Sequence, residues 1–245
     1  MRGTVLSRGR TQETQGLERK WVEKWDRDLA TIAALNTYAV STGRTLALQG
    51  GIAVEAHCGG RLTRPHGDVD TILYMNADRP INHEQDRADL ETLLKQEGHT
   101  NWASHNPQDG HKIEFRENVR AKPWNERRRL EVNLADYPMG ERTQTMSLID
   151  SRGSSHTVTV ENIDLLVANK ARIIVNNIGK TDVARPTEEQ DLSDMRRLMS
   201  QPHYNREHCI SFLQRHYAHS ESLTADLARN KAHEVLEQAE TAKLT

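Results

Sequence analysis

The spacing of apolar residues changes near residue 155, and this change constrains the fold more than any other feature of the chain. Before it, apolar residues gather in short runs separated by turn-forming residues, a pattern typical of strands. After it, they recur at steps of three and four, a pattern typical of helices. The sequence therefore predicts an α+β fold. A mixed sheet flanked by helices is expected over residues 15–155, and a helical C-terminal domain over residues 156–245. Residues 1–14 are expected to form a mobile arm.

Helices and extended segments alternate through the first part of the chain. Residues 15–42 have the strongest helical pattern, because Leu17, Trp21, Trp25, Leu29 and Ile32 form one apolar stripe. We interpret both tryptophans as core residues rather than as a ligand platform. Further helices are expected at 52–58 and 84–97, extended segments at 45–48, 68–74, 101–104, 111–116, 128–134, 147–149 and 156–160, and C-terminal helices from 161 onward, including 188–199, 206–219 and 222–242.

Composition and charge exclude several classes of protein. The formal net charge of −2 gives no global argument for binding nucleic acid or a membrane surface. No apolar run approaches the roughly 18 residues of a membrane span, and the first residues lack the apolar core of a signal peptide. Cys58 and Cys209 are too few for a disulfide framework and lack the CxxC spacing of a zinc site. We expect a cytoplasmic protein with no membrane partner.

An acidic pair, Asp68-Val69-Asp70, begins one of the expected strands. Side chains alternate along a strand, so both carboxylates point to one face while Val69 points into the core. Two neighbouring carboxylates repel each other unless a cation lies between them, and Mg²⁺ prefers such oxygen ligands. An isolated pair of this kind is more often a solvated strand end. Three further features favour a metal site.

Two of these features precede the acidic pair. Gly50-Gly51 stands between a strand and a helix, where glycine lets backbone N–H groups and the helix N-terminus approach phosphates. An ordinary strand–helix turn is the alternative explanation. Arg64-Pro65-His66 offers cationic and donor groups for a triphosphate. Loop solubility and ion pairing with Asp68 or Glu55 is the alternative there.

The third feature is Glu131, in the run Arg129-Leu130-Glu131-Val132-Asn133-Leu134. The apolar residues of this run take one face of the strand, and Glu131 and Asn133 take the other. A carboxylate that faces out of an adjacent strand can complete a three-acid site. A solvated residue on an open face is the alternative. Asp136 is the second choice for the third acid, and Glu114 comes after it.

With these motifs identified, residues 50–70 resemble the nucleotidyltransferases of the DNA polymerase β superfamily. They are most similar to the branch of aminoglycoside 2″-adenylyltransferases and lincosamide nucleotidyltransferases. That branch has a double glycine, a short helix with an acidic residue, a G-R-x-T-R-x-H loop and a D-h-D pair, where h is hydrophobic. The matching elements here are Gly50-Gly51, Glu55, Gly60-Arg61-Leu62-Thr63-Arg64-Pro65-His66 and Asp68-Val69-Asp70. Gly51 stands where many members of the superfamily carry a serine.

A second, schematic resemblance lies in the helical part. Many of these enzymes, and the related AbiE-type toxin nucleotidyltransferases, have a lysine in an apolar helix, followed by a charged helix containing D-x-x-D. Lys170 and the pair Asp191 and Asp194 match these features, although Gln190 stands where the family usually has a basic residue. The resemblance implies that Lys170 reaches the nucleotide phosphates and that Asp191 orients Lys170 or a nearby arginine. A surface lysine beside a polar helix face is the alternative.

The resemblance implies metal-dependent nucleotidyl transfer. Asp68 and Asp70 would bind one or two Mg²⁺ ions together with the triphosphate of an NTP, with ATP the expected substrate. Glu131 would complete the metal site or act as general base. A second group of residues would hold the nucleotide, namely Gly50, Gly51, Arg64, His66 and Lys170.

Three hypotheses concern the acceptor of the nucleotide. The favoured acceptor is the hydroxyl of a small molecule such as an aminoglycoside or a lincosamide, which the match over residues 50–70 implies. The alternative is a toxin that modifies tRNA or a protein, for which Lys170 and a basic hairpin at 116–129 with Trp124 at its tip are the support. A non-catalytic nucleotide-binding module is the third hypothesis, and the three carboxylates argue against it.

Overall fold

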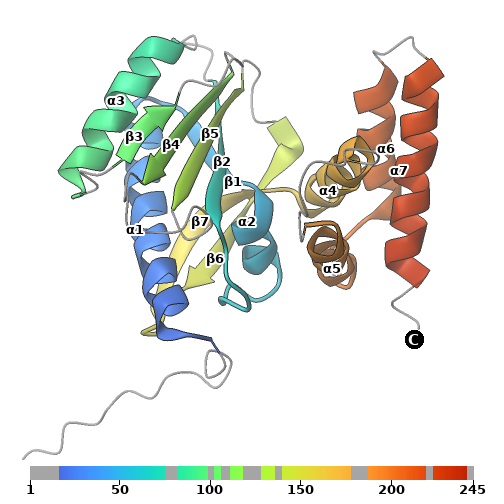
Figure 1. Ribbon diagram of the computed structural model, residues 1–245, viewed down its shortest axis with the longest axis horizontal. Coiled ribbons are helices and arrows are strands. Elements are labelled where there is room, and N and C mark those ends of the chain that lie inside the picture. The colour runs from blue at the N-terminus through green and yellow to red at the C-terminus, as the bar shows by residue number, and fades with distance from the viewer. Residues whose placement is uncertain are drawn as a thin grey trace, which may run out of the picture. The chain divides into compact units, whose positions relative to one another are not determined.

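The computed structural model describes residues 17–75, 82–98, 102–105, 111–117, 128–135, 140–177, 187–218 and 223–241. Its strands all lie before residue 162, and the chain after them is helical, so the predicted α+β fold is confirmed (Figure 1). By internal contacts the chain divides into two compact units, Met1–Val160 and Glu161–Thr245. This division falls a few residues after the expected boundary, because the last strand pairs within the sheet. The expected arm, residues 1–14, lies outside the described residues.

Seven strands form one mixed sheet in the order β3-β4-β5-β2-β1-β7-β6. Strand β2 lies at its centre, antiparallel to β1 and parallel to β5. Strand β4 is antiparallel to both β5 and β3, and β1 is parallel to β7. Every predicted extended segment contributes a strand, although β6 begins before the predicted residue 147. The strands are β1 (Thr45–Leu48), β2 (Asp68–Tyr74), β3 (Trp102–His105), β4 (Lys112–Glu117), β5 (Arg129–Ala135), β6 (Thr143–Ile149) and β7 (Ser155–Glu161).

Helices α1 (Arg19–Ser41) and α3 (His83–Gln96) lie on one face of the sheet, and the short helix α2 (Gly50–His57) lies on the other (Figure 1). The stripe predicted for α1 is buried from Trp25 onward, where the Trp25 Nε1 donates to the Ile149 carbonyl at 2.9 Å. Trp21, which was expected in the core, is partly exposed near the start of the helix. Helix α1 begins at Arg19 rather than at residue 15.

A buried network of charges anchors the start of β5 to α1. Arg128, which immediately precedes β5, donates its Nε to the Asp28 Oδ1 at 2.9 Å and an Nη to the Thr31 Oγ1 at 2.9 Å. The Lys24 ammonium lies 2.6 Å from the second oxygen of Asp28. Buried ion pairs are stable only when their remaining donors and acceptors are satisfied, which this network achieves through Thr31. The network therefore fixes the position of the strand that carries Glu131.

The two faces of the central strands differ in polarity, as the alternation predicts. On β5, Leu130 and Val132 are fully buried on the face that α1 covers, and Ile113 and Phe115 on β4 are fully buried beside them. The residues between them project from the opposite face, next to α2. We call this opposite surface the polar face, and its members are Asp68 and Asp70 on β2, Lys112, Glu114 and Arg116 on β4, and Arg129, Glu131 and Asn133 on β5.

The second unit consists of helices. Helix α4 packs against each of the other three, and Val167, Leu198 and Leu213 are buried among them. Their bounds lie close to those predicted for the C-terminal helices. Among the described helices, none combines the length and apolar character needed to cross a membrane. The helices are α4 (Ile163–Asn177), α5 (Thr187–Met199), α6 (Arg206–Ala218) and α7 (Leu223–Thr241).

Candidate active site

The pairing of β2 with β5 brings together the predicted carboxylates. In the parallel register, Asp70 is the Cα partner of Glu131, and Asp68 is the partner of Arg129. Partners in adjacent strands project from the same face of a sheet, so Asp68, Asp70 and Glu131 all belong to the polar face. Asp136, the second choice for the third acid, lies outside the described residues.

A fourth carboxylate extends this row onto β4. Glu114 is the Cα partner of Glu131 in the antiparallel pair, so Asp70, Glu131 and Glu114 lie side by side on three adjacent strands. The Glu114 side chain is ion-paired with Arg116 of the same strand. The pKa of Glu114 is lowered despite burial, because Arg116, Arg129 and Lys112 favour its charged form.

Gly50 is the first residue of α2, and it lies against the acidic pair. Its backbone has a φ of +60°, a conformation that side-chain-bearing residues rarely adopt. A Cβ added at this position would lie 2.2 Å from the Asp70 Oδ2. The backbone N–H of Gln49 also donates to the Asp70 carbonyl at 2.8 Å. The helix N-terminus therefore lies directly against the Asp70 carboxylate, and only glycine fits between them.

Gly51 is enclosed by the two donors predicted for the triphosphate. A Cβ at Gly51 would lie 2.5 Å from the His66 Nδ1 and 2.9 Å from an Nη of Arg64. A serine side chain at this position would collide with both side chains. The structure thus brings Arg64 and His66 to the first turn of α2, next to the glycine pair.

His66 is itself buried and braced by Glu55. Its Nε2 lies 3.0 Å from the Glu55 Oε1, and the Thr63 hydroxyl contacts both carboxylate oxygens of Glu55, at 2.8 and 2.9 Å. The sequence left ion pairing with Glu55 open as an alternative role for His66, and this contact is present. The His66 imidazole therefore lies between Gly51, in the first turn of α2, and Glu55, in the turn that follows.

Two cations that the sequence analysis did not assign to the site neutralise its acids. Arg129 donates an Nη to the Asp68 Oδ2, and the Lys112 ammonium lies 2.5 Å from the Glu131 Oε2. Among the described residues, no such partner is found for Asp70. The alternation of Lys112, Glu114 and Arg116 along β4 was the available signal, but it becomes informative only once β4 is known to pair with β5.

Burial and like charges act on Asp70. Burial, together with the negative charges of Asp68 and Glu131, raises the pKa of Asp70 to about 8, and Arg129 and Lys112 only partly oppose this. Burial lowers the pKa of Arg129, but the same carboxylates outweigh it, so this pKa is raised. Asp70 is therefore short of positive charge, which an additional cation would supply.

A divalent metal ion fits this site by ligand chemistry, although the side chains are not arranged around one. Among the described residues, no three acidic, histidine or cysteine side chains converge as metal ligands do. Instead, Asp68 and Glu131 are turned toward Arg129 and Lys112. Mg²⁺ prefers one or two carboxylates plus substrate phosphates, and Asp70 with its neighbours supplies that donor set. Binding of a metal ion by these acids would require Asp68 to separate from Arg129 and Glu131 to separate from Lys112.

Lys170 belongs to the second unit. Its ammonium lies 2.8 Å from Asp191 and 2.9 Å from Asp194, and its side chain is almost completely buried. Pairing with Asp191 is the contact that the second resemblance implied. A contact between Lys170 and a nucleotide stays a prediction.

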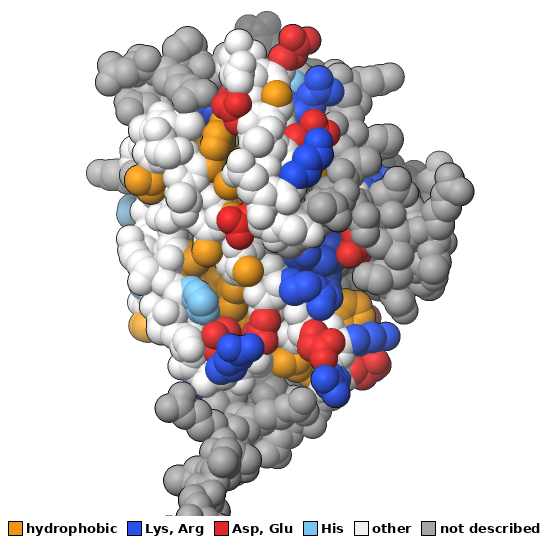
Figure 2. Space-filling view, turned by 90° about the vertical axis from the view of Figure 1, so that its left-hand side faces the viewer, with side chains coloured by type: hydrophobic (Ala, Val, Ile, Leu, Met, Phe, Trp, Pro, Cys, Tyr) orange, Lys and Arg blue, Asp and Glu red, His pale blue; other side chains and the backbone are white. Residues whose placement is uncertain are grey.

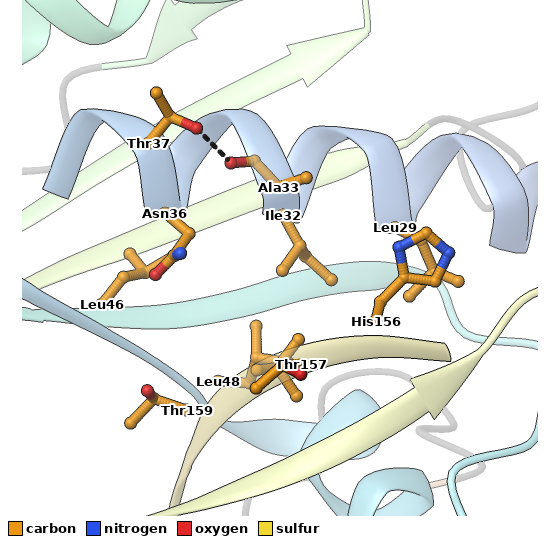
Figure 3. Close-up of a pocket in the computed structure, with 11 residues that line it drawn as sticks. Leu29, Ile32, Ala33, Asn36, Thr37, Leu46, Leu48, His156, Thr157 and Thr159 are labelled. Atoms are coloured by element: carbon orange, nitrogen blue, oxygen red, sulfur yellow. Dashed lines mark hydrogen bonds between the residues drawn. The ribbon is translucent and has the colours of Figure 1, made fainter. Parts of the chain in front are cut away.

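A separate hollow of about 270 Å³ lies on the face of the sheet that α1 covers. Figure 2 shows apolar side chains along this face, and Figure 3 shows how helix and strand residues line the hollow. Leu48 of its lining pairs with Thr71, which alternates with Asp70, so the hollow opens away from the polar face. None of its lining residues is acidic. The lining includes Leu29, Ile32, Leu46, Leu48, His156 and Thr159.

Comparison with known proteins gives matches only among solved structures. No family model and no curated protein matches the chain. JHP933 from Helicobacter pylori is 15% identical, with 93% of this chain and 94% of that chain covered and a TM-score of 0.47. An antigenic nucleotidyltransferase-like protein from Paracoccidioides brasiliensis is 15% identical, with 84% and 93% covered and a TM-score of 0.42. ANT(2″)-Ia in complex with adenylyl-2″-tobramycin is 16% identical, with 87% and 97% covered and a TM-score of 0.41.

Proposed function

We propose that this protein is a magnesium-dependent nucleotidyltransferase that moves a nucleoside monophosphate from an NTP to an acceptor hydroxyl. One observation supports it above all. The β2–β5 register sets Asp68, Asp70 and Glu131 on one face, directly against the glycine-bearing N-terminus of α2. The acids require a cation, and the neighbouring backbone N–H groups suit a phosphate. A site that binds a metal ion together with a nucleotide needs both.

The reaction follows from the roles of these side chains. Asp68 and Asp70 would hold Mg²⁺, which would supply neutralisation of the charge on the triphosphate. Glu131 orients the acceptor hydroxyl and accepts its proton. The acceptor oxygen forms a bond to the α-phosphorus, and the bond from that phosphorus to the bridging oxygen breaks. Its electrons leave with pyrophosphate. Positioning and charge neutralisation supply most of the rate enhancement in such transfers.

Different groups are assigned to the leaving pyrophosphate. The backbone N–H groups at Gly50 and Gly51 and the Arg64 guanidinium lie together at the first turn of α2, where an anion is favoured. His66 is assigned a bracing role, because it is buried and bonded to Glu55. ATP is the proposed nucleotide, and Lys170 is kept as a proposed phosphate contact.

A small-molecule hydroxyl is the proposed acceptor. Its support is the motif over residues 50–70, which resembles that of enzymes modifying aminoglycosides and lincosamides. The basic hairpin that favoured a tRNA acceptor, residues 116–129, lies mostly outside the described residues, so tRNA and protein acceptors become alternatives for the experiment to decide.

The test measures nucleotide binding and its dependence on Mg²⁺. Pure protein would be titrated with ATP in the presence and absence of Mg²⁺, and the same titration repeated with Asp68→Asn and Asp70→Asn. We expect nucleotide binding that requires Mg²⁺ and weakens about ten-fold or more in both variants, since each removes a charged metal ligand. Full Mg²⁺-dependent binding in these variants would disprove the assignment of the acids.

A further inference from the structure

The register of β2 and β5 places Arg129 next to the three proposed metal ligands. It is the first residue of β5, opposite Asp68 in the parallel register and two residues before Glu131 on the same face. Its guanidinium donates to Asp68 and interacts electrostatically with Asp70 and Glu131 as well.

The Arg129–Asp68 pair conflicts with a metal held by the same carboxylate. A divalent ion bound by Asp68 and Asp70 needs oxygens that Arg129 partly occupies, and it repels a guanidinium at close range. The Arg129 side chain is 40% exposed, so part of its surface already faces solvent. A metal ion at Asp68 would therefore compete with Arg129 for this carboxylate.

A released guanidinium next to a metal-bound triphosphate has an acceptor of matching shape. Its planar fork of donors binds phosphate oxygens in pairs, and such charged hydrogen bonds are about twice as strong as neutral ones. We propose that Arg129 is a nucleotide-binding residue that pairs with Asp68 only while the site lacks metal, and that metal loading transfers its guanidinium to the triphosphate. This inference rests on the proposed function and adds a residue and an order of events to it.

The arrangement has two measurable consequences of opposite sign. Arg129 competes with metal for Asp68, so its removal strengthens the binding of metal alone. Arg129 also contributes to nucleotide binding, so its removal weakens the binding of nucleotide to the metal-loaded protein. A residue with a merely structural role would move both affinities in the same direction.

The neighbouring strand supplies a matched control. Arg116 is the Cα partner of Arg129, lies on the same face and is ion-paired with Glu114, just as Arg129 is with Asp68. Glu114 is not one of the proposed metal ligands. Arg116→Gln therefore removes the same charge from the same surface without freeing a metal ligand.

The experiment is calorimetric titration of the full-length protein with Mg²⁺ alone, and then of the Mg²⁺-saturated protein with a nucleotide. The nucleotide is an ATP analogue whose α,β-bridging oxygen is replaced by methylene, so that it is not consumed. For Arg129→Gln we expect Mg²⁺ alone to bind about three-fold more tightly, the scale of a partly exposed ion pair. We expect the analogue to bind about ten-fold more weakly or worse, the scale of a charged hydrogen bond. Arg116→Gln should change both affinities by less than about two-fold.

A second variant keeps the inference testable if Arg129→Gln folds poorly. Arg129→Lys keeps the charge but lacks the fork, so Mg²⁺ affinity should stay near that of the wild type while the analogue binds less tightly. Unchanged or weaker Mg²⁺ binding by Arg129→Gln, or unchanged analogue binding by both variants, overturns the inference and leaves the proposed function intact. A wild-type protein that binds the analogue equally well without Mg²⁺, or not at all, overturns both.

Discussion

At the scale of single residues, the candidate site is defined by an excess of negative charge that the chain neutralises only in part. Asp68 and Glu131 have cationic partners, whereas Asp70 is partly buried beside both acids and its pKa is raised to about 8. Such a carboxylate lowers the stability of the folded protein as long as no cation is bound to it. The charge that suits Asp70 for binding a cation therefore destabilises the folded protein without the cation, and this destabilisation can be measured.

Asp70→Asn should stabilise the protein in the absence of metal. The amide has nearly the same shape but needs no proton to remain neutral, so burial and the neighbouring acids no longer penalise it. We expect the free energy of unfolding at pH 7 to rise by on the order of 1–2 kcal/mol. Urea denaturation in the presence of a chelator measures it. Asp26→Asn, on α1 away from the acids, is the control, and it should not stabilise the protein. A loss of stability in Asp70→Asn would contradict the description of this site.

The same comparison has a defined pH dependence. A carboxyl whose pKa is raised on folding contributes its full stability below its ordinary pKa of 3.8, and that stability is lost as the pH rises toward 8. The advantage of Asp70→Asn over the wild type should therefore widen between pH 5 and pH 8 and level off above it. Denaturation curves of both proteins at several pH values test this. An advantage that narrows as the pH rises would show that the sign is wrong.

Gly50 provides a steric prediction at the same scale. Gly50→Ala places a methyl group against the Asp70 carboxylate and holds a side chain at positive φ. We expect Mg²⁺-dependent ATP binding to weaken about ten-fold or more, with a stability loss of about 1–3 kcal/mol. Gly59→Ala also has a positive φ but meets no atom within 4 Å, so it carries the backbone strain alone. Equal losses of ATP binding in both variants would contradict the role of the close approach.

At the scale of elements, the sequence predicted more of the parts than of their pairing. Alternation and turn residues identified the strands, and the polar side of β5 followed from Leu130, Val132 and Leu134. The parallel register between β2 and β5 joins residues about sixty positions apart, and no local pattern reports such a pairing. Arg129 and Lys112 were missed for this reason, since each reaches its acid only through the register. Gly50 and Asp70 were both predicted from the motif over residues 50–70, and the antiparallel pairing of β1 with β2 brings them together.

The contacts of Glu55 with His66 and Thr63, which we call the brace, yield a prediction for helix α2 as a whole. Glu55 is fully buried and contacts both the buried His66 imidazole and the Thr63 hydroxyl, so Glu55→Ala removes both of these contacts. We expect a loss of about 2–4 kcal/mol in the free energy of unfolding. Glu23→Ala removes an exposed pair with Arg19 and should cost less than about 1 kcal/mol. Thermal or urea unfolding distinguishes them, and a cost for Glu55→Ala as small as that for Glu23→Ala would mean that the brace is not structural.

At the scale of the whole molecule, a sheet that carries the acids is followed by a helical unit with its own buried core and its own ion pairs. The change in periodicity along the chain predicted strands first and helices after them, because strands and helices need different spacings of apolar residues. Nothing in the spacing predicted that the lysine of α4 would be buried between two aspartates. That arrangement depends on how α4 and α5 pack, which is a tertiary property.

The nucleotidyl transfer proposed for this protein can be measured by following the α-phosphate of ATP. Pure protein with Mg²⁺ and ATP labelled at the α-phosphate would be incubated with aminoglycosides and lincosamides, with total tRNA, with protein or with no acceptor. We predict that label moves onto a small molecule with release of pyrophosphate, that chelation of Mg²⁺ stops it, and that Asp70→Asn does not support it. Label on tRNA or protein would keep the enzyme class and change the acceptor. No transfer to any acceptor, together with no Mg²⁺-dependent binding of ATP, would contradict the account.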